Sequence, residues 1–125
     1  KLGKKLKTLN EIMDTDIPII NSKSTIIDAV LIMTEKKYGC VVVLDKNKKI
    51  KGIITDGDLR RSISKINFKK KATSIMKSRP IVASKDLLIS SAIVLMNKYS
   101  ITSLIIAKQN KPIGIVNLKK CLEND

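Results

Sequence analysis

Histidine and tryptophan are absent from this 125-residue chain, and cysteine occurs only at Cys40 and Cys121. Without histidine and without a Cys-x-x-Cys pair, the sequence lacks the usual ligands of a zinc site and the usual base for a nucleophilic cysteine. Each cysteine stands alone in an apolar stretch, which is typical of a buried thiol. We therefore expect no metal site and no catalysis by cysteine or histidine.

Aromatic residues make up only 2% of the chain, whereas hydrophobic residues make up 43%. The core must therefore be built from Ile, Val, Leu, Met and Ala. The formal net charge of +14 would ordinarily suggest nucleic acid or an anionic membrane as a partner. However, almost all of the basic residues are lysines scattered through turns and helix faces, and the few rings are too sparse for base stacking. We predict no nucleic-acid partner, and a polyanion binder stays open as a minor alternative.

No apolar run approaches the roughly 18 to 20 residues of a membrane helix, and no signal peptide opens the chain. We therefore expect a cytoplasmic protein without a membrane partner. The length of 125 residues suits one compact domain, or two small halves that share a core. Because the chain begins with lysine rather than methionine, we expect it to be a fragment of a longer protein.

From residue 12 onward the sequence contains the same pattern twice. A helical stripe with the spacing i, i+3, i+4, i+7 occurs in both copies, and this spacing is typical of a half-buried helix. The stripe consists of Ile26, Ala29, Val30 and Met33 in the first copy and of Ile89, Ala92, Ile93 and Met96 in the second. Other matched segments are Ile12-Met13 with Ile75-Met76, Pro18-Ile19-Ile20 with Pro80-Ile81-Val82, Val41–Leu44 with Leu104–Ala107, and Gly52-Ile53-Ile54 with Gly114-Ile115-Val116.

Each copy predicts a short strand, a helix, two strands and a closing helix, with Ser24 and Asp86 as N-caps of the two longer helices. One unit of about 50 residues would expose too much apolar sheet alone, so two units should pack together. We predict an α+β fold of two tandem, pseudo-two-fold halves, each with a small β-sheet and two helices, in which Met33 and Met96 are buried. The predicted domains are a linker over 1–11, a first motif over 12–64, a second linker over 65–74 and a second motif over 75–125.

The stretch Gly52–Arg61 predicts a strand, a tight turn and a helix start, with Asp56 as the helix N-cap. Thr55 and Asp58 lie three residues apart at this turn. A hydroxyl can donate to a phosphate, a carboxylate can accept from ribose hydroxyls, and free amides at a helix start favour an anion. The plainer interpretation, in which Asp56 and Asp58 only cap the helix, stays open.

The duplicated unit, in which each copy ends in Gly-apolar-apolar-(Thr/Asn), resembles a tandem pair of CBS motifs, or Bateman module, over residues 12–122. The segments KLGKKL at 1–6, GIITDGDLRR at 52–61 and Ile101-Thr102-Ser103-Leu104 are similar to the C-terminal part of the bacterial arabinose-5-phosphate isomerases. In that family a sugar-isomerase (SIS) domain precedes the CBS pair. The full enzyme interconverts ribulose 5-phosphate and arabinose 5-phosphate for the Kdo of lipopolysaccharide. The resemblance implies a regulatory or assembly-forming pair, with the SIS domain of the same chain as its partner.

The resemblance also implies a small anionic effector between the repeats, namely an adenine or cytidine nucleotide or a nucleotide sugar, with no other cofactor and no metal. The matching positions are Thr55 and Asp58 for ribose and phosphate, Gly39, Cys40, Thr102 and Ser103 for a phosphate loop, and Pro18, Ile19, Pro80 and Ile81 for the strand beside the base. In the second repeat Asn117 stands in place of Thr55 and Lys120 in place of Asp58. Because lysine cannot accept from ribose hydroxyls, we expect one dominant site, in the first repeat.

These features predict a ligand-sensing module of an arabinose-5-phosphate isomerase. Two alternatives stay open: a structural oligomerisation module without a physiological ligand, and a CBS pair of another protein. The apolar helices predicted around 59–66 and 118–122 favour a homo-oligomer through the CBS faces. The chain itself is not expected to be an enzyme, because sugar-phosphate isomerisation needs an acid and a base beside an enediol. The chain has no histidine, and its three glutamates fall at segment edges.

Overall fold

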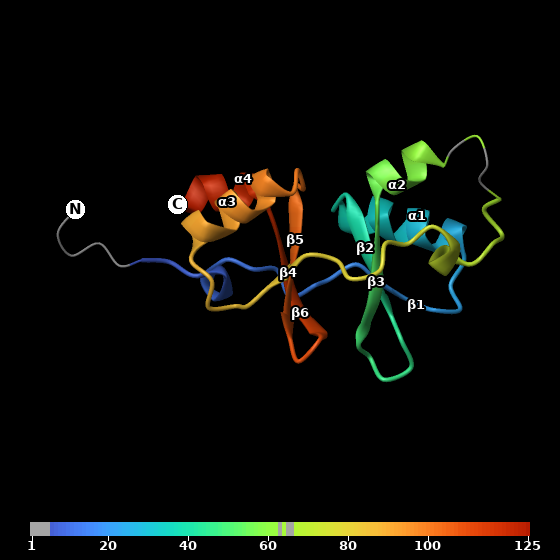
Figure 1. The fold of residues 1–125 in the computed structure, drawn as a ribbon, viewed down its shortest axis with the longest axis horizontal. Helices are drawn as coiled ribbons and strands as arrows, with labels where there is room; N and C mark the ends of the chain where they lie inside the picture. Colours follow the sequence, from blue (N-terminus) through green and yellow to red (C-terminus); the bar gives the residue numbers. More distant parts are fainter. Residues whose placement is uncertain (1–5, 63, 65–66) are drawn as a thin grey trace. The chain divides into compact units, whose positions relative to one another are not determined.

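The computed structural model describes residues 6–62, 64 and 67–125. Most of the predicted KLGKKL segment, Ile63 in the predicted closing helix and residues 65–66 of the predicted link lie outside the described residues. The chain divides into two compact units (Figure 1). Residues 16–80 form the first unit, and residues 81–125, joined by the N-terminal segment up to Thr15, form the second.

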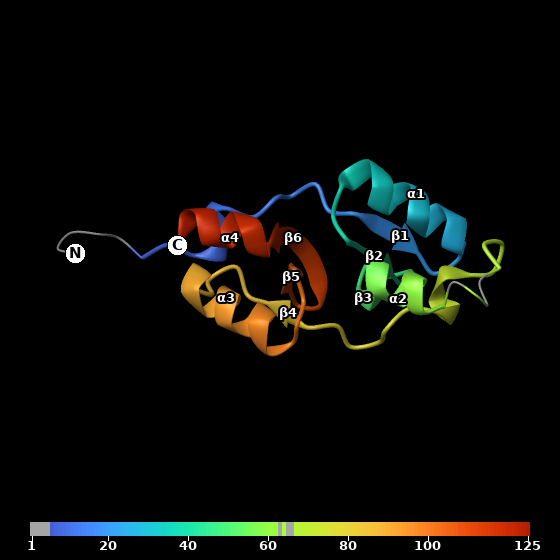
Figure 2. The same ribbon diagram turned by 90° about the horizontal axis from the view of Figure 1, so that it is seen from above.

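The first unit is a three-stranded sheet with its helices. The strand order is β1-β2-β3, with β1 parallel to β2 and β2 antiparallel to β3. Figure 2 shows α1 and α2 of this unit from above. Its core contains Ile20, Ala29, Met33, Val41, Val43, Ile54 and Ala72. The elements are β1 (Ile19–Asn21), α1 (Ile26–Lys36), β2 (Cys40–Leu44), β3 (Ile50–Thr55), α2 (Asp56–Arg61) and the 3-10 turn η3 (Ala72–Ser74).

The second unit repeats this architecture. Its strand order is β4-β5-β6, again with one parallel and one antiparallel pair. The predicted α+β fold of two similar halves is therefore confirmed. The elements are η1 (Leu9–Glu11), β4 (Val82–Ala83), α3 (Ile89–Lys98), β5 (Ser103–Lys108), β6 (Lys111–Asn117) and α4 (Leu118–Asn124).

The two predicted helical stripes point into the two cores. Met33 is 6% exposed and Met96 is fully buried, so the predicted burial of both methionines is confirmed. The one difference within the stripes is that Val30 and Ile93 are only half-buried. Cys40 and Cys121 are buried thiols, as expected.

Three predicted helix caps are wrong by one or two residues. Thr25, not Ser24, caps α1, because the Asp28 side chain at the third helical position accepts from the Thr25 amide (2.8 Å) and completes a capping box. The cap of α3 is Leu88 rather than Asp86, and no side chain bonds there. Instead, the Ile89 amide donates to the Lys7 carbonyl (3.0 Å), so the N-terminal segment supplies a partner.

The start of α2 is the third such case. Its N-cap is Thr55 and not Asp56, because Asp58 lies at the third helical position and can reciprocate the Thr55 hydroxyl. Asp56 is instead the first helical residue, where an acidic side chain is favourable to the helix dipole.

Both repeated Ile-Met pairs pack beside the edge strand of a sheet. The Lys77 and Ile53 backbones exchange two hydrogen bonds (2.8 and 2.9 Å) beside β3, which places Met76 against Gly52. In the same way, Asp14 and Ile115 exchange two bonds (2.8 and 2.9 Å) beside β6, and Met13 lies against Gly114. Each Ile-Met pair therefore begins one sequence repeat but packs in the compact unit that contains the sheet of the other repeat.

We predict that Gly52→Ala destabilises the first unit by about 1–3 kcal/mol, because an added methyl group overpacks a filled site. A Cβ at residue 52 would lie 2.7 Å from the Lys77 carbonyl oxygen, which is backbone and held in a bridge. The control is Gly57→Ala in α2, where the added Cβ meets only the flexible end of Arg61 and gains helix propensity. Urea unfolding should show a lower free energy of unfolding for Gly52→Ala alone. Equal stabilities of the two variants would refute the close approach of the Lys77 carbonyl to residue 52.

Candidate functional site

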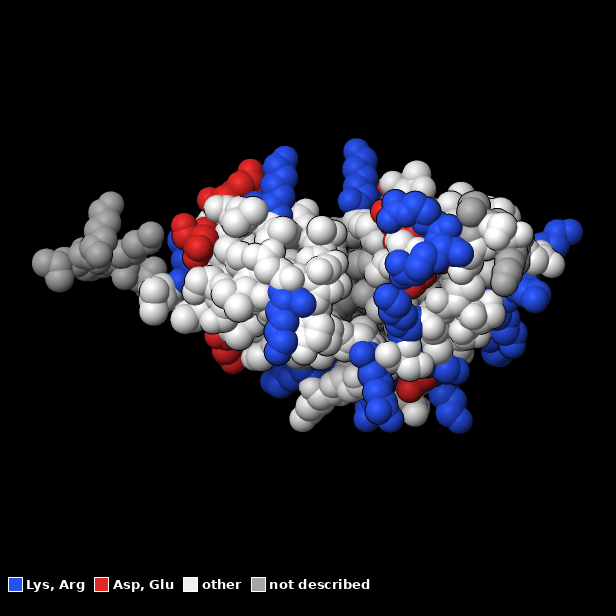
Figure 3. Space-filling view, turned by 45° about the horizontal axis from the view of Figure 1, so that its top comes forward, with Lys and Arg blue, Asp and Glu red and all other residues white. Residues whose placement is uncertain are grey.

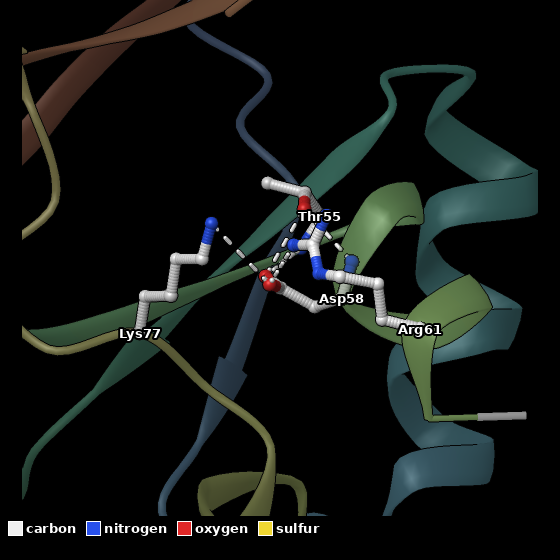
Figure 4. A network of polar contacts seen from close by, with 4 residues as sticks. All are labelled: Thr55, Asp58, Arg61 and Lys77. Atoms are coloured by element: carbon white, nitrogen blue, oxygen red, sulfur yellow. Dashed lines mark hydrogen bonds and ion pairs between the residues drawn. The ribbon is translucent and has the colours of Figure 1, made fainter. Parts of the chain in front are cut away.

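The predicted Thr55–Asp58 pair lies where β3 runs directly into α2. The Asp58 amide donates to the Thr55 hydroxyl oxygen (3.2 Å). In return, Asp58 Oδ2 accepts from the Thr55 amide (2.9 Å) and from the Thr55 hydroxyl (3.0 Å). The two side chains thus form a reciprocal capping box at the end of the sheet (Figure 4).

The other oxygen of Asp58 faces two cations. The Arg61 guanidinium donates to Asp58 Oδ1 at 2.8 Å, and the Lys77 ammonium lies 3.6 Å from the same oxygen (Figure 4). Asp58 is only 6% exposed and is the one buried charged residue among those described. Burial alone would raise the pKa of Asp58, but the Thr55 amide and hydroxyl, Arg61 and Lys77 together hold this pKa below its ordinary value. Asp58 is therefore a carboxylate at neutral pH.

The geometry decides what this pair can do in the ligand-free state. The single hydrogen of the Thr55 hydroxyl is given to Asp58, so it is not available to a phosphate. Asp58 does cap the helix, as the plainer interpretation held, whereas the Asp56 side chain does not. The capping function is thus a structural fact, and a ligand-binding function for Thr55 and Asp58 stays a prediction.

Other predicted residues of the first repeat lie at the same end of the sheet. Cys40 pairs with Thr55 across β2 and β3, and the Gly39 carbonyl accepts from the Asp56 amide (3.0 Å). Pro18 and Ile19 lie one strand away, where the Pro18 carbonyl accepts from Val42 (2.9 Å) and Ile19 is 38% exposed. The fold therefore gathers Gly39, Cys40 and Thr55 and sets Pro18 and Ile19 along the neighbouring edge.

The second repeat has the corresponding arrangement with different chemistry. Asn117 caps α4 by accepting from the Lys120 amide (2.7 Å), so Asn117 and Lys120 occupy the places of Thr55 and Asp58. Ser103 pairs with Asn117, and the Thr102 carbonyl accepts from Leu118 (2.8 Å). Ile81 begins this unit just before β4, whereas Pro80 closes the first unit.

A cavity of about 290 Å³ opens in the first unit between α1 and the start of α2. Of the predicted site residues, Gly39 lines it. Its other walls are apolar (Val30, Met33 and Leu59) and polar (Lys37, Tyr38 and Asp56).

Sequence reasoning missed two members of the polar cluster, Arg61 and Lys77. The spacing of Arg61, three residues after Asp58 in a helix, was a usable signal for an ion pair. Lys77 had no local signal, because it reaches Asp58 only through the pairing of its segment with β3. Within the described ranges 6–62, 64 and 67–125, no three His, Cys, Asp or Glu side chains gather as a metal site would require. In the same ranges, no helix is both long and apolar enough to cross a membrane.

The match to known families decides the identity of the fold. The family model described as the CBS domain matches residues 9–65 and again residues 72–124. The chain belongs to the CBS-domain family. It is a tandem CBS pair, and each match covers one sequence repeat.

Two curated relatives match nearly the whole CBS pair. An uncharacterised protein of Rickettsia prowazekii is 35% identical over 123 residues, which are 97% of this chain and 39% of that protein. Arabinose 5-phosphate isomerase KdsD of Yersinia pestis is 34% identical over 126 residues, with 97% and 38% covered. The chain thus spans about two-fifths of the length of these relatives and corresponds to the CBS part of the isomerase.

Among solved structures, a CBS domain pair in complex with 5′-methylthioadenosine and S-adenosyl-L-methionine has the same fold, with a TM-score of 0.86. It is 21% identical in sequence, and 96% of each chain is covered. At this identity the likeness establishes the fold alone.

Proposed function

We propose that this CBS pair is the ligand-sensing regulatory part of an arabinose 5-phosphate isomerase. The observation that carries the proposal is the buried carboxylate of Asp58, held beside Thr55, Gly39 and Cys40 at one end of the first sheet. The similarity to KdsD supports the parent enzyme, and the KLGKKL and GIITDGDLRR segments carry that resemblance. Isomerisation itself belongs, in this proposal, to a SIS domain of the same protein.

The effector is an adenine or cytidine nucleotide, or a nucleotide sugar. Its ribose hydroxyls would donate to Asp58, which Thr55 holds in place, and Gly39 and Cys40 would line its phosphate. Pro18 and Ile19 would flank the base, and Pro80 and Ile81 are the matching positions of the second repeat. Asn117, Thr102 and Ser103 form the weaker second site, because Lys120 provides no acceptor there.

Binding would act on the enzyme by changing the balance between two packings of the module. Coupling free energies between sites are typically about 1–3 kcal/mol, which correspond to roughly 5- to 150-fold changes in affinity. The coupling is reciprocal, so a substrate of the parent enzyme would change the affinity for the effector by the same factor.

Calorimetric titration of AMP, ATP, CMP and a CMP-sugar into the chain tests the proposal. We expect at least one of these ligands to bind with one dominant site per chain. Two equal sites would show that Asp58 and Lys120 are equivalent in binding, which contradicts the proposal. A chain that binds none of the four would favour the structural oligomerisation module instead.

A second function, assembly, is supported by exposed apolar side chains on the helices. Leu31 of α1 is 60% exposed, Ile27 of α1 is 42% exposed and Leu122 of α4 is 59% exposed. Of the helices predicted to associate, Leu122 belongs to 118–122, whereas Leu59 is half-buried and Ile63 lies outside the described residues. Ile27 and Leu31 lie four residues apart and therefore on one face of α1, and contiguous exposed apolar surface is typical of a protein contact.

We therefore predict a homo-oligomer through these CBS faces. Light scattering of the wild-type chain at high concentration should give a mass above that of the monomer. Leu31→Lys and Leu122→Lys should lower that mass, because a lysine ammonium at an apolar contact would be buried without a partner. A monomer mass at every concentration would refute the assembly.

A further inference from the structure

The two oxygens of Asp58 have different kinds of partner. Oδ2 accepts from the Thr55 amide and hydroxyl, and both bonds belong to the start of α2. Among the described residues, Oδ1 faces the long side chains of Arg61 and Lys77, which are 64% and 62% exposed. A ligand hydroxyl can therefore reach Oδ1 without breaking the helix cap, but it must take the place of these cations.

The exposed cations can return to water at little cost, and the ligand hydroxyl replaces them as the partner of the buried carboxylate, so that Asp58 is not left unpaired. The displaced cations would also stay close to the site. Arg61 is fixed by its place in α2, and the Lys77 backbone is held by two hydrogen bonds to Ile53 (2.8 and 2.9 Å). Both side chains would then lie within reach of an anion that is carried by the same ligand.

The local charge favours this anion. One carboxylate, Asp58, faces two cations, so the cluster has a net positive charge. Figure 3 shows blue Lys and Arg side chains around red acidic ones on this face of the first unit. Arg61 and Lys77 are both exposed.

The second unit carries the opposite charges at the two corresponding positions. Asp14 occupies the place of Lys77, since each is bonded to the edge of its sheet, to Ile115 and Ile53 respectively. Lys120 occupies the place of Asp58. Both charges are thus reversed in the second unit, so that in each unit the residue beside the sheet edge and the residue at the third helical position are opposite in charge.

We propose that Arg61 and Lys77 occupy Asp58 Oδ1 in the ligand-free state and move to the phosphate of a nucleotide when its ribose takes that oxygen. This inference rests on the proposed nucleotide site and names its specificity residues. A phosphorylated nucleoside gives both cations a new anionic partner. A neutral nucleoside displaces them without compensation and therefore binds more weakly.

Titration calorimetry with AMP and adenosine on the 125-residue chain tests this exchange, in which Arg61 and Lys77 leave Asp58 for the phosphate. The wild type should bind AMP at least about ten-fold more tightly than adenosine, because hydrogen bonds between charged groups are the stronger ones. Arg61→Gln and Lys77→Gln should each weaken AMP binding by about ten-fold or more. Adenosine affinity should stay unchanged or rise by up to about five-fold, since each variant removes a cation that adenosine would otherwise displace from Asp58. The control Arg60→Gln, which changes an exposed neighbour outside the cluster, should leave both affinities unchanged.

The outcomes separate the exchange from the site itself. If wild-type AMP binding depends on Asp58 but both glutamine variants keep the wild-type ratio of AMP to adenosine affinity, the exchange is wrong and the site stands. Equal affinities of the wild type for AMP and adenosine would also refute the exchange. A wild type that binds neither probe would overturn the exchange together with the proposed adenine-nucleotide site.

Discussion

Asp58→Ala is expected to weaken nucleotide binding to the CBS pair by roughly 10- to 150-fold. The variant removes the carboxylate to which the ribose hydroxyls would donate, and a hydrogen bond to a charged group contributes about 1.5–3 kcal/mol. Asp58 is buried and is the only carboxylate in the polar cluster with Thr55, Arg61 and Lys77. The measurement is a calorimetric titration of the nucleotide that binds the wild type.

The variant also breaks a helix cap, so it needs a control that breaks the same kind of cap away from the site. Asp28→Ala provides it, because Asp28 forms the same capping box with Thr25 at the start of α1 (2.8 and 3.4 Å). Each cap is expected to contribute about 1 kcal/mol to stability. Asp28→Ala should therefore lower the melting temperature and leave binding intact. Lys120→Ala in the second repeat should also leave nucleotide binding nearly unchanged.

Two results would contradict the assignment of Asp58. One is a wild-type affinity in Asp58→Ala, and the other is an equal loss of affinity in Asp58→Ala and Asp28→Ala.

The titration of these variants should be carried out near pH 7. The folded-state pKa of Asp58 is lowered, so the stability that its charge contributes is present above the unfolded pKa of about 3.9 and is lost as the pH falls through the folded value. Near neutral pH Asp58 is ionised, so neither the stability of the fold nor the carboxylate that accepts from ribose is lost by protonation.

The architecture was predictable because its signals are local and occur twice. The stripe Ile26, Ala29 and Met33 fixes which face of α1 is buried, and its copy in α3 makes chance agreement implausible. The helix caps were less predictable, because neighbouring hydroxyls compete. Serine alone is at least as good a cap as threonine, and Thr25 is selected because its amide also donates to the Asp28 carboxylate.

The site was predictable only in part, because its members come from distant segments. The sequence indicates Thr55 and Asp58 through their spacing at a turn, and the register of β2 with β3 then brings Cys40 to Thr55. Lys77 joins them from a segment that follows the first repeat. No local pattern predicts this arrangement, since it depends on two backbone hydrogen bonds to the edge of β3.

Met96→Ala is expected to destabilise the second unit by about 2–5 kcal/mol, which is the usual cost of truncating a large core side chain. Met96 is fully buried in α3 and belongs to the same core as Leu104, Ile106 and Val116. Val94→Ala is the matched control, because Val94 lies two residues away in the same helix but is 67% exposed. The control should change stability by no more than about 0.5 kcal/mol. Urea unfolding followed by circular dichroism measures both, and similar losses in the two variants would show that the helical stripe does not face the core.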